Sequence, residues 1–187
     1  GNGLLLGSAV NYARDIGATP PNVCNPDWVA AQARKLAKDT GLKCTVIDHA
    51  KAKKLGMGGL VTVGHGSDSK SCLIHLAHVP KKRTRAAKGK RLVLVGKTLT
   101  YDTGGYSLKV NNGMKGMKYD KMGGCAVIGA MKAIAELDLP IEVHALLAAA
   151  ENMVSGDSMR PDDIITMYNG VTVEITNTDA EGRLVLA

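Results

Sequence analysis

The sequence predicts an α/β fold in which a mixed, mostly parallel sheet is flanked by helices in a three-layer sandwich. Two observations support this prediction. Apolar runs of strand length alternate with helical patterns along the chain. The run over residues 91–95 is also almost entirely apolar, as is typical of a strand buried on both faces of a sheet. A hydrophobic fraction of 45% in 187 residues is sufficient for one domain with a core.

Two helices are predicted by their ends and by the spacing of their apolar residues. Asn25 is an N-cap candidate before Pro26, and Gly41 ends the apolar face that follows. From Gly123 onward, apolar residues recur three and four positions apart, and Pro140 lies beyond the end of this pattern. Shorter elements lie between these helices. We expect a short helix over residues 50–55 and strands over 44–47, 60–63, 72–79, 91–95, 141–150 and 171–176.

The chain is expected to have two parts. Residues 1–24 are predicted to be a linker helix that leads into a domain formed by residues 25–187. The last four residues, 184–187, are apolar, with no glycine, proline or polar tail after them. We therefore expect a fold that is truncated at its C-terminal end.

The positive charge of the chain is concentrated in one segment. Lys and Arg number 24 against 17 acidic residues, and the excess of seven lies in residues 80–91, PKKRTRAAKGKR. A run of this kind is usually a solvated loop, here a hairpin loop between two strands. The alternative is a nucleic-acid or anion-binding module. An aromatic content of 3% leaves few rings on which bases could stack, so a nucleic-acid partner is disfavoured.

The cysteines and the hydropathy indicate a cytoplasmic protein. The four cysteines are far apart and include no CxxC, which favours buried, reduced thiols: Cys24, Cys44, Cys72 and Cys125. No apolar run approaches the roughly 20 residues that a membrane span requires. The five histidines form no HExxH motif, and we expect them to be structural.

Acidic residues and lysines lie beside glycines in three segments, 97–109, 117–120 and 177–183. Two of these segments directly follow expected strands, where α/β sheets bind their ligands. Each residue alone could be a helix cap or a solvated charge. Together, four carboxylates in converging loops would repel one another unless divalent cations compensated them. Oxygen donors without histidine favour Mg²⁺, Mn²⁺ or Zn²⁺.

The octapeptide NTDAEGRL at residues 177–184 resembles the signature of the leucyl (cytosol) aminopeptidases, peptidase family M17. The resemblance extends to Lys97, to DTGG at 102–105 and to MKYD at 117–120. It covers essentially the whole chain, most densely residues 92–187. The chain departs from the family pattern at three positions, none of them a candidate ligand: Thr98, Val154 and Asp162.

This resemblance implies a binuclear metal-dependent aminopeptidase that releases N-terminal residues, leucine-type, from peptides by metal-activated water. Residues 25–187 would be the metal-binding part of its catalytic domain. Two divalent ions per subunit, of Mn²⁺, Zn²⁺ or Mg²⁺, would be held by five residues: Lys97, Asp102, Asp120, Asp179 and Glu181. Lys97 can ligate only as the neutral amine, so its pKa must be strongly depressed in the loaded site.

The resemblance also implies roles beyond the metal ligands. Lys109 would stabilise the oxyanion, and Arg183 would hold a bicarbonate that acts as general base. Met117 and Asn177 would contact the substrate, a peptide with a free N-terminus. Relatives form hexamers, so the whole protein is expected to be a homo-oligomer. Because an N-terminal domain and the C-terminal remainder are absent, we expect the 187 residues alone to be inactive.

Three other interpretations use residues of the same chain. Asp102-Thr103-Gly104 resembles the motif of aspartic proteases, but that chemistry needs a second aspartate and an all-β fold. Gly123-Gly124 could bind phosphate at a helix N-terminus, although helix packing explains the pair without a ligand. A catalytically dead relative that serves as a scaffold is the third alternative.

Overall fold

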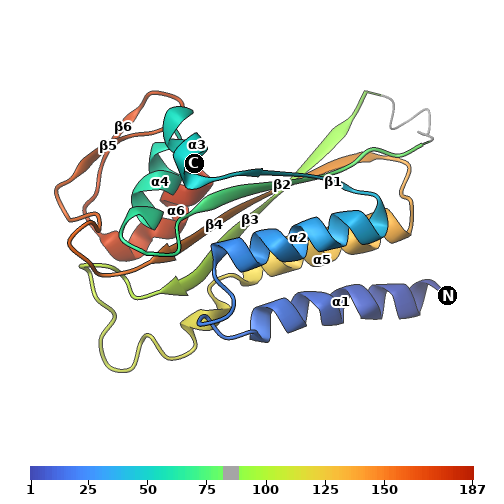
Figure 1. Ribbon diagram of the computed structural model, residues 1–187, viewed down its shortest axis with the longest axis horizontal. Helices are drawn as coiled ribbons and strands as arrows, with labels where there is room; N and C mark the ends of the chain where they lie inside the picture. Colours follow the sequence, from blue (N-terminus) through green and yellow to red (C-terminus); the bar gives the residue numbers. More distant parts are fainter. Residues whose placement is uncertain (82–88) are drawn as a thin grey trace.

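The computed structural model describes residues 1–81 and 89–187 as a sheet with helices on both faces (Figure 1). The four-stranded main sheet has the order β1-β2-β4-β3. Its strands are β1 (Lys43–Ile47), β2 (Cys72–His78), β3 (Arg91–Asp102) and β4 (Glu142–Asn152). A small antiparallel sheet pairs β5 (Ile164–Thr166) with β6 (Thr172–Glu174).

Helices of very different lengths connect these strands. The α-helices are α1 (Asn2–Ala18), α2 (Pro26–Thr40), α3 (His49–Lys54), α4 (Gly58–His65), α5 (Met122–Glu136) and α6 (Glu181–Leu186). Two single turns of 3₁₀ helix, η2 (Met117–Tyr119) and η3 (Thr178–Ala180), precede α5 and α6. No described helix is both long enough and apolar enough to cross a membrane.

The predicted mixed sheet between helices is confirmed, with a smaller parallel share than expected. β3 and β4 are parallel, whereas β1–β2 and β2–β4 are antiparallel. Parallel neighbours need a long crossover, and α5 supplies one between β3 and β4. β2 and β3 run in opposite directions, so the connection between them needs no such crossover. Strand direction depends on these connections, which the apolar runs do not encode.

The segment 80–91 is not a hairpin loop, which corrects the sequence-based expectation. A hairpin joins neighbouring strands, but β4 lies between β2 and β3 in the sheet. Residues 82–88, which carry most of the basic run, lie outside the described residues. The alternative of an anion-binding module on this run is therefore not addressed by the structure.

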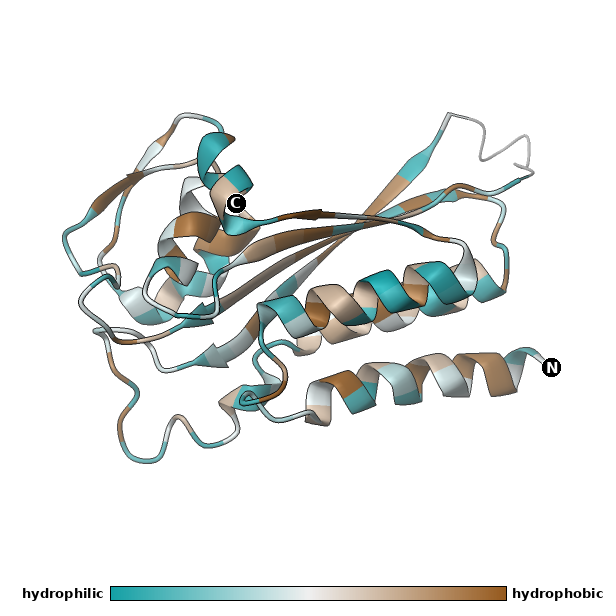
Figure 2. Ribbon diagram, viewed as in Figure 1, coloured by the Kyte–Doolittle hydropathy of each residue, from teal (hydrophilic) through white to brown (hydrophobic). Residues whose placement is uncertain are grey.

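Two cores lie on opposite faces of the sheet. α2 and α5 cover one face, where Ile74, Leu76 and Leu147 are fully buried, and α1 packs against α5 (Figures 1 and 2). α4 and α6 cover the other face only near the carboxyl ends of β3 and β4, around Leu99 and Ala150. The result is a three-layer arrangement in which the second outer layer is confined to one end of the sheet.

The ends of α2 and the packing of α5 follow the sequence signals. The Asn25 side chain accepts a hydrogen bond from the backbone N–H of Trp28 at 2.9 Å, and Gly41 ends the helix in the left-handed region at φ +77°. α5 lies directly on β3, since a Cβ at Gly96 would be 2.7 Å from the Cα of Gly124. The second glycine of the pair 123–124 therefore serves close packing between helix and strand.

The strand predicted over residues 60–63 is wrong, because these residues lie in α4. A short apolar run fits a buried helix as well as a strand. Close contacts with β5 and α6 accompany the helical conformation. A Cβ at Gly58 would lie 1.8 Å from the Thr166 carbonyl oxygen, and one at Gly59 would lie 2.0 Å from that of Leu184. The helix fits only because glycines let it approach the backbones of β5 and α6.

Candidate metal centre

Acidic side chains from distant segments converge where β3 and β4 end. Carboxylate oxygens of Asp102, Asp179 and Glu181 all lie within 4.8 Å of one another. Asp102 ends β3, and the other two lie in η3 and at the start of α6. Asp102 and Glu181 are buried, while Asp179 is partly exposed. The sequence-based expectation that these segments converge at the strand ends is realised.

A β-bulge places Lys97 and Asp102 at the same site. Five positions separate these residues, so regular alternation along β3 would direct their side chains to opposite faces. The register with β4 shifts between Leu99 and Tyr101, which adds one residue to β3. Asp102 therefore joins the cluster that Lys97 contacts.

Lys97 bridges two carboxylates. Its Nζ lies 3.0 Å from Asp120 Oδ2 and 2.8 Å from Glu181 Oε1. Burial lowers the pKa of Lys97, but hydrogen bonds with Glu181 and Asp120 outweigh burial and raise the pKa above its ordinary value. In the chain without cations, Lys97 is thus an ammonium ion. The neutral amine that a ligand requires forms only if a cation replaces the proton.

Lys109 bridges the other two carboxylates. Its Nζ lies 2.6 Å from Asp179 Oδ1 and 3.0 Å from Asp102 Oδ2. Burial lowers the pKa of Lys109 somewhat, whereas the hydrogen bonds with Asp179 and Asp102 raise it well above its ordinary value. Each of the four carboxylates therefore faces one lysine, and each lysine faces two carboxylates.

Two lysines leave this acidic cluster under-compensated. Burial raises the pKa of Glu181 and of Asp120, and the hydrogen bonds from Lys97 offset only part of this effect. Glu181 Oε2 is buried and has no hydrogen-bond partner among the described residues. A buried carboxylate oxygen without a donor is costly. This donor set of carboxylates and one amine, with an unpartnered buried oxygen, fits divalent cations.

Asn152 and Thr178 hold the cluster in place. The Asn152 amide donates to Asp102 Oδ1 at 2.8 Å and to the Thr178 carbonyl oxygen at 3.1 Å, which links β3 to η3. The Thr178 hydroxyl donates to the Gly104 carbonyl oxygen at 2.5 Å and accepts from the N–H of Ser107 at 2.7 Å. These contacts orient the carboxylates from behind.

Asn152 and Thr178 are not among the site residues predicted from the sequence. The sequence shows only that Asn152 follows the apolar run 141–150, and the register that aligns it with Asp102 is seen in the structure. Two glycines also belong to this frame. Gly104 has φ +85°, and a Cβ at Gly182 would lie 3.0 Å from Lys97 Nζ.

The other predicted site residues lie around the cluster without joining it. Met117 is half-buried in η2, three residues before Asp120. The Asn177 side chain accepts a hydrogen bond from the N–H of Asp179 at 2.8 Å, so it caps η3. Arg183 is exposed on α6. Their assignments to substrate and bicarbonate stay predictions.

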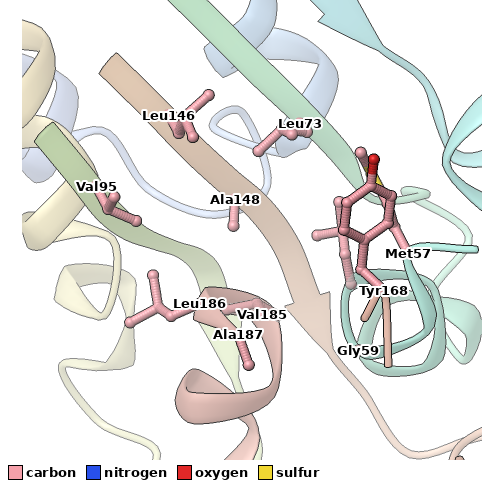
Figure 3. Close-up of a pocket in the computed structure, with 11 residues that line it drawn as sticks. Met57, Gly59, Leu73, Val95, Leu146, Ala148, Tyr168, Val185, Leu186 and Ala187 are labelled. Carbon is pink, nitrogen blue, oxygen red and sulfur yellow. The ribbon is translucent and has the colours of Figure 1, made fainter. Parts of the chain in front are cut away.

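An apolar pocket is separate from this cluster. It lies on the open part of the sheet face, between Val95, Leu146, Tyr168 and the end of α6 (Figure 3). Its lining includes no acidic, basic or histidine side chain. It has no donor set for a metal ion, so the candidate centre is the carboxylate cluster.

Fold and cluster together define a class: α/β proteins that can hold divalent cations on carboxylates at the ends of parallel strands. Comparison with known proteins specifies the family. The model of the "Cytosol aminopeptidase family, catalytic domain" matches residues 11–187, and the chain belongs to this family.

Similar proteins agree with this assignment. A "Probable cytosol aminopeptidase" of Stutzerimonas stutzeri is 50% identical over 97% of the chain, and the "Cytosol aminopeptidase" of Pseudomonas aeruginosa is 49% identical over 97% of it. The chain spans 36% of the length of both relatives. The solved structure "Bottromycin maturation enzyme BotP in complex with Mn" aligns with the whole chain and 39% of its own, at a TM-score of 0.92 and 38% identity.

Proposed function

We propose that this chain is the metal-binding part of a metal-dependent aminopeptidase. Membership of the cytosol aminopeptidase family supports the activity, and the buried carboxylate cluster supports the metal. The observation that carries the proposal is the buried Oε2 of Glu181, which lies within a set of four acidic residues and has no hydrogen-bond partner in residues 1–81 and 89–187. The whole protein would release N-terminal residues, leucine-type, from peptides.

Five residues would hold two divalent ions: Lys97, Asp102, Asp120, Asp179 and Glu181. When bound, such ions activate water and polarise the scissile carbonyl. Lys97 must give up its Nζ proton in order to ligate, because an ammonium has no lone pair. Asn152 keeps Asp102 oriented through the 2.8 Å hydrogen bond to Oδ1.

Lys109 would act on the substrate rather than on the metal. Its raised pKa keeps Nζ protonated, so it can donate to the negative charge that develops on the carbonyl oxygen. Arg183, exposed two residues after Glu181, would hold the bicarbonate base. Met117 and Asn177 would contact the N-terminal residue of the peptide.

The location and assembly of the whole protein are further parts of this proposal. The family name of the relatives supports a cytoplasmic location. A hexameric assembly is expected from the family resemblance. Because the chain spans 36% of these relatives, the 187 residues alone are expected to bind metal without significant peptidase activity.

A metal titration of the chain tests the first step. Isothermal titration with MnCl₂ is expected to show binding that Asp120→Ala weakens and that Asp157→Ala, in an exposed loop, leaves unchanged. Hydrolysis of leucine p-nitroanilide by the full-length protein tests the second step. Equal Mn²⁺ affinity in both variants would refute the site. Metal binding without turnover in the full-length protein would favour the scaffold alternative.

A further inference from the structure

Lys121 is a fully buried lysine that the proposed chemistry does not use. Its side chain has a relative exposure of 0%, and it directly follows the candidate ligand Asp120. A buried ammonium is unfavourable unless its protons find acceptors. Lys121 therefore needs a structural explanation of its own.

The acceptors of Lys121 are backbone carbonyls of two different segments. Nζ donates to the carbonyl oxygen of Thr19 at 3.0 Å and also to that of Lys118. Thr19 is the C-cap of α1, and Lys118 lies in the η2 turn. The carbonyl groups at a helix C-terminus carry partial negative charge, and α1 has no basic residue in its own last turn. Lys121, which lies outside α1, supplies a positive charge at this helix end.

The same contact region is closely packed. A Cβ at Gly17 would lie 2.3 Å from Met122 Sδ, and one at Gly129 would lie 2.9 Å from Ala13 Cβ, so α1 lies directly on α5. Lys118 Nζ also donates to the Ala18 carbonyl oxygen, at 3.4 Å. The end of α1 thus contacts η2 and the start of α5 together.

Two residues of the candidate site belong to the η2 turn: Met117 begins it, and Asp120 is its C-cap. The N–H groups of Tyr119 and Asp120 donate to the carbonyl oxygens of Gly116 at 2.9 Å and Met117 at 3.2 Å. The Asp120 carboxylate contacts Lys97, with 3.0 Å between Oδ2 and Nζ. In contrast to Asp102, the carboxylate of Asp120 has no hydrogen bond from an amide side chain in the described part of the chain.

We propose that Lys121 is a positioning residue for Asp120: its ammonium ties the η2 turn to the end of α1 and thereby holds the Asp120 carboxylate at the metal centre. The segment 1–24 then supports the site and does more than link domains. The effect of Lys121 on metal binding rests on the proposed function, whereas its effect on the η2 turn does not.

Hydrogen exchange of the metal-free chain tests the turn directly. In Lys121→Met, the amides of Tyr119 and Asp120 should exchange at least about tenfold faster, because an interaction with a charged donor is lost. Amides of β2 and β4 should be unchanged. Lys132→Met is the matched control, since Lys132 lies on the same helix and pairs with Glu136 at the surface. Unchanged exchange of Tyr119 and Asp120 in a folded variant would overturn the proposal.

A double-mutant cycle on Mn²⁺ affinity separates positioning from general stability. Lys121→Met should weaken binding about tenfold alone and have little further effect beside Asp120→Ala, because both act on one ligand. Additive effects would overturn the positioning role. If the unmodified chain bound no Mn²⁺, the proposed function would fail, and hydrogen exchange would still decide the role of Lys121.

A more conservative variant tests the proposal if Lys121→Met fails to fold. Lys121→Gln keeps N–H donors on a shorter side chain, so its effect on exchange should be intermediate. If Lys121→Gln also failed to fold while Lys132→Met folded, Lys121 would be assigned to fold stability, and the positioning proposal would be overturned.

Discussion

Both ends of the sheet carry titratable groups, but their hydrogen bonds and ion pairs are satisfied differently. At the end where β4 begins, His144 Nε2 pairs with Glu142 Oε1 at 2.9 Å, and Arg91 reaches the same oxygen at 3.1 Å. His75 Nε2 and His144 Nδ1 share a hydrogen bond of 2.9 Å. At the end where β4 finishes, Glu181 Oε2 is buried without a described partner.

This difference teaches where to look for a ligand. Among residues 1–81 and 89–187, no buried side-chain nitrogen or oxygen at the histidine end lacks a hydrogen-bond partner, so this end gives no sign of an external group. The carboxylate end has more acceptors than donors, and a cation would remove that imbalance. An incomplete set of partners distinguishes a candidate site better than the presence of charged residues does.

The largest effect is expected from removing a carboxylate of the cluster. Glu181→Ala should reduce Mn²⁺ affinity by more than the roughly 10- to 100-fold typical of losing an outer contact, because Glu181 is a proposed direct ligand. Glu142→Ala, at the histidine end, should leave affinity unchanged. Isothermal titration of both variants measures the contrast, and similar losses in the two would remove the distinction between the ends.

A smaller effect is expected from Asn152, which orients Asp102. Asn152→Ala should weaken Mn²⁺ binding by roughly 10- to 100-fold. It should also cost about 1.5–3 kcal/mol of unfolding free energy, because a buried hydrogen bond to a charged group is lost. Asn169→Ala, in the exposed turn between β5 and β6, is the control. Urea unfolding and metal titration report the two effects, and unchanged Mn²⁺ affinity would argue against an orienting role.

Metal binding should strengthen with rising pH. The hydrogen bonds with Glu181 and Asp120 raise the pKa of Lys97, so binding must release its proton. Below that pKa, affinity at the site should rise by about tenfold per pH unit for each proton released. Titrations in buffers of different ionisation enthalpy count the protons. Binding with no proton release would show that Lys97 is not a ligand.

The smallest effect is expected at the histidine end. Burial and the neighbouring His144 lower the pKa of His75, so the folded chain favours the neutral ring. The stability from this preference is complete above the unfolded pKa of about 6.5 and is lost as the pH falls below it. Thermal unfolding should therefore show a modest loss on acidification that His75→Gln reduces. An equal loss in that variant would assign the effect to other groups.

Much of the fold could be predicted because its signals are local. The cap at Asn25 and the glycine at 41 determine the ends of α2, and both act within one helical turn. The apolar runs predicted where the four strands of the main sheet lie, although β3 continues through Asp102, beyond the predicted residues 91–95. They did not predict strand order, because the position of β4 between β2 and β3 depends on contacts between distant segments.

In the candidate site, too, some residues could be predicted from the sequence and others could not. Its carboxylates were recognised by their residue types, since acids beside glycines after strands are unusual. Asn152 and Lys121 were missed because an amide at a strand end and a lysine at a helix start are ordinary in sequence. Only the tertiary structure shows that one contacts Asp102 and the other contacts the end of α1.

Crystals of the chain soaked in MnCl₂ and measured at the manganese absorption edge test the central claim most directly. We predict anomalous peaks between the carboxylates of Asp102, Asp179 and Glu181, with Lys97 and Asp120 as further ligands. The absence of peaks there, or peaks at His75 and His144 instead, would contradict the account.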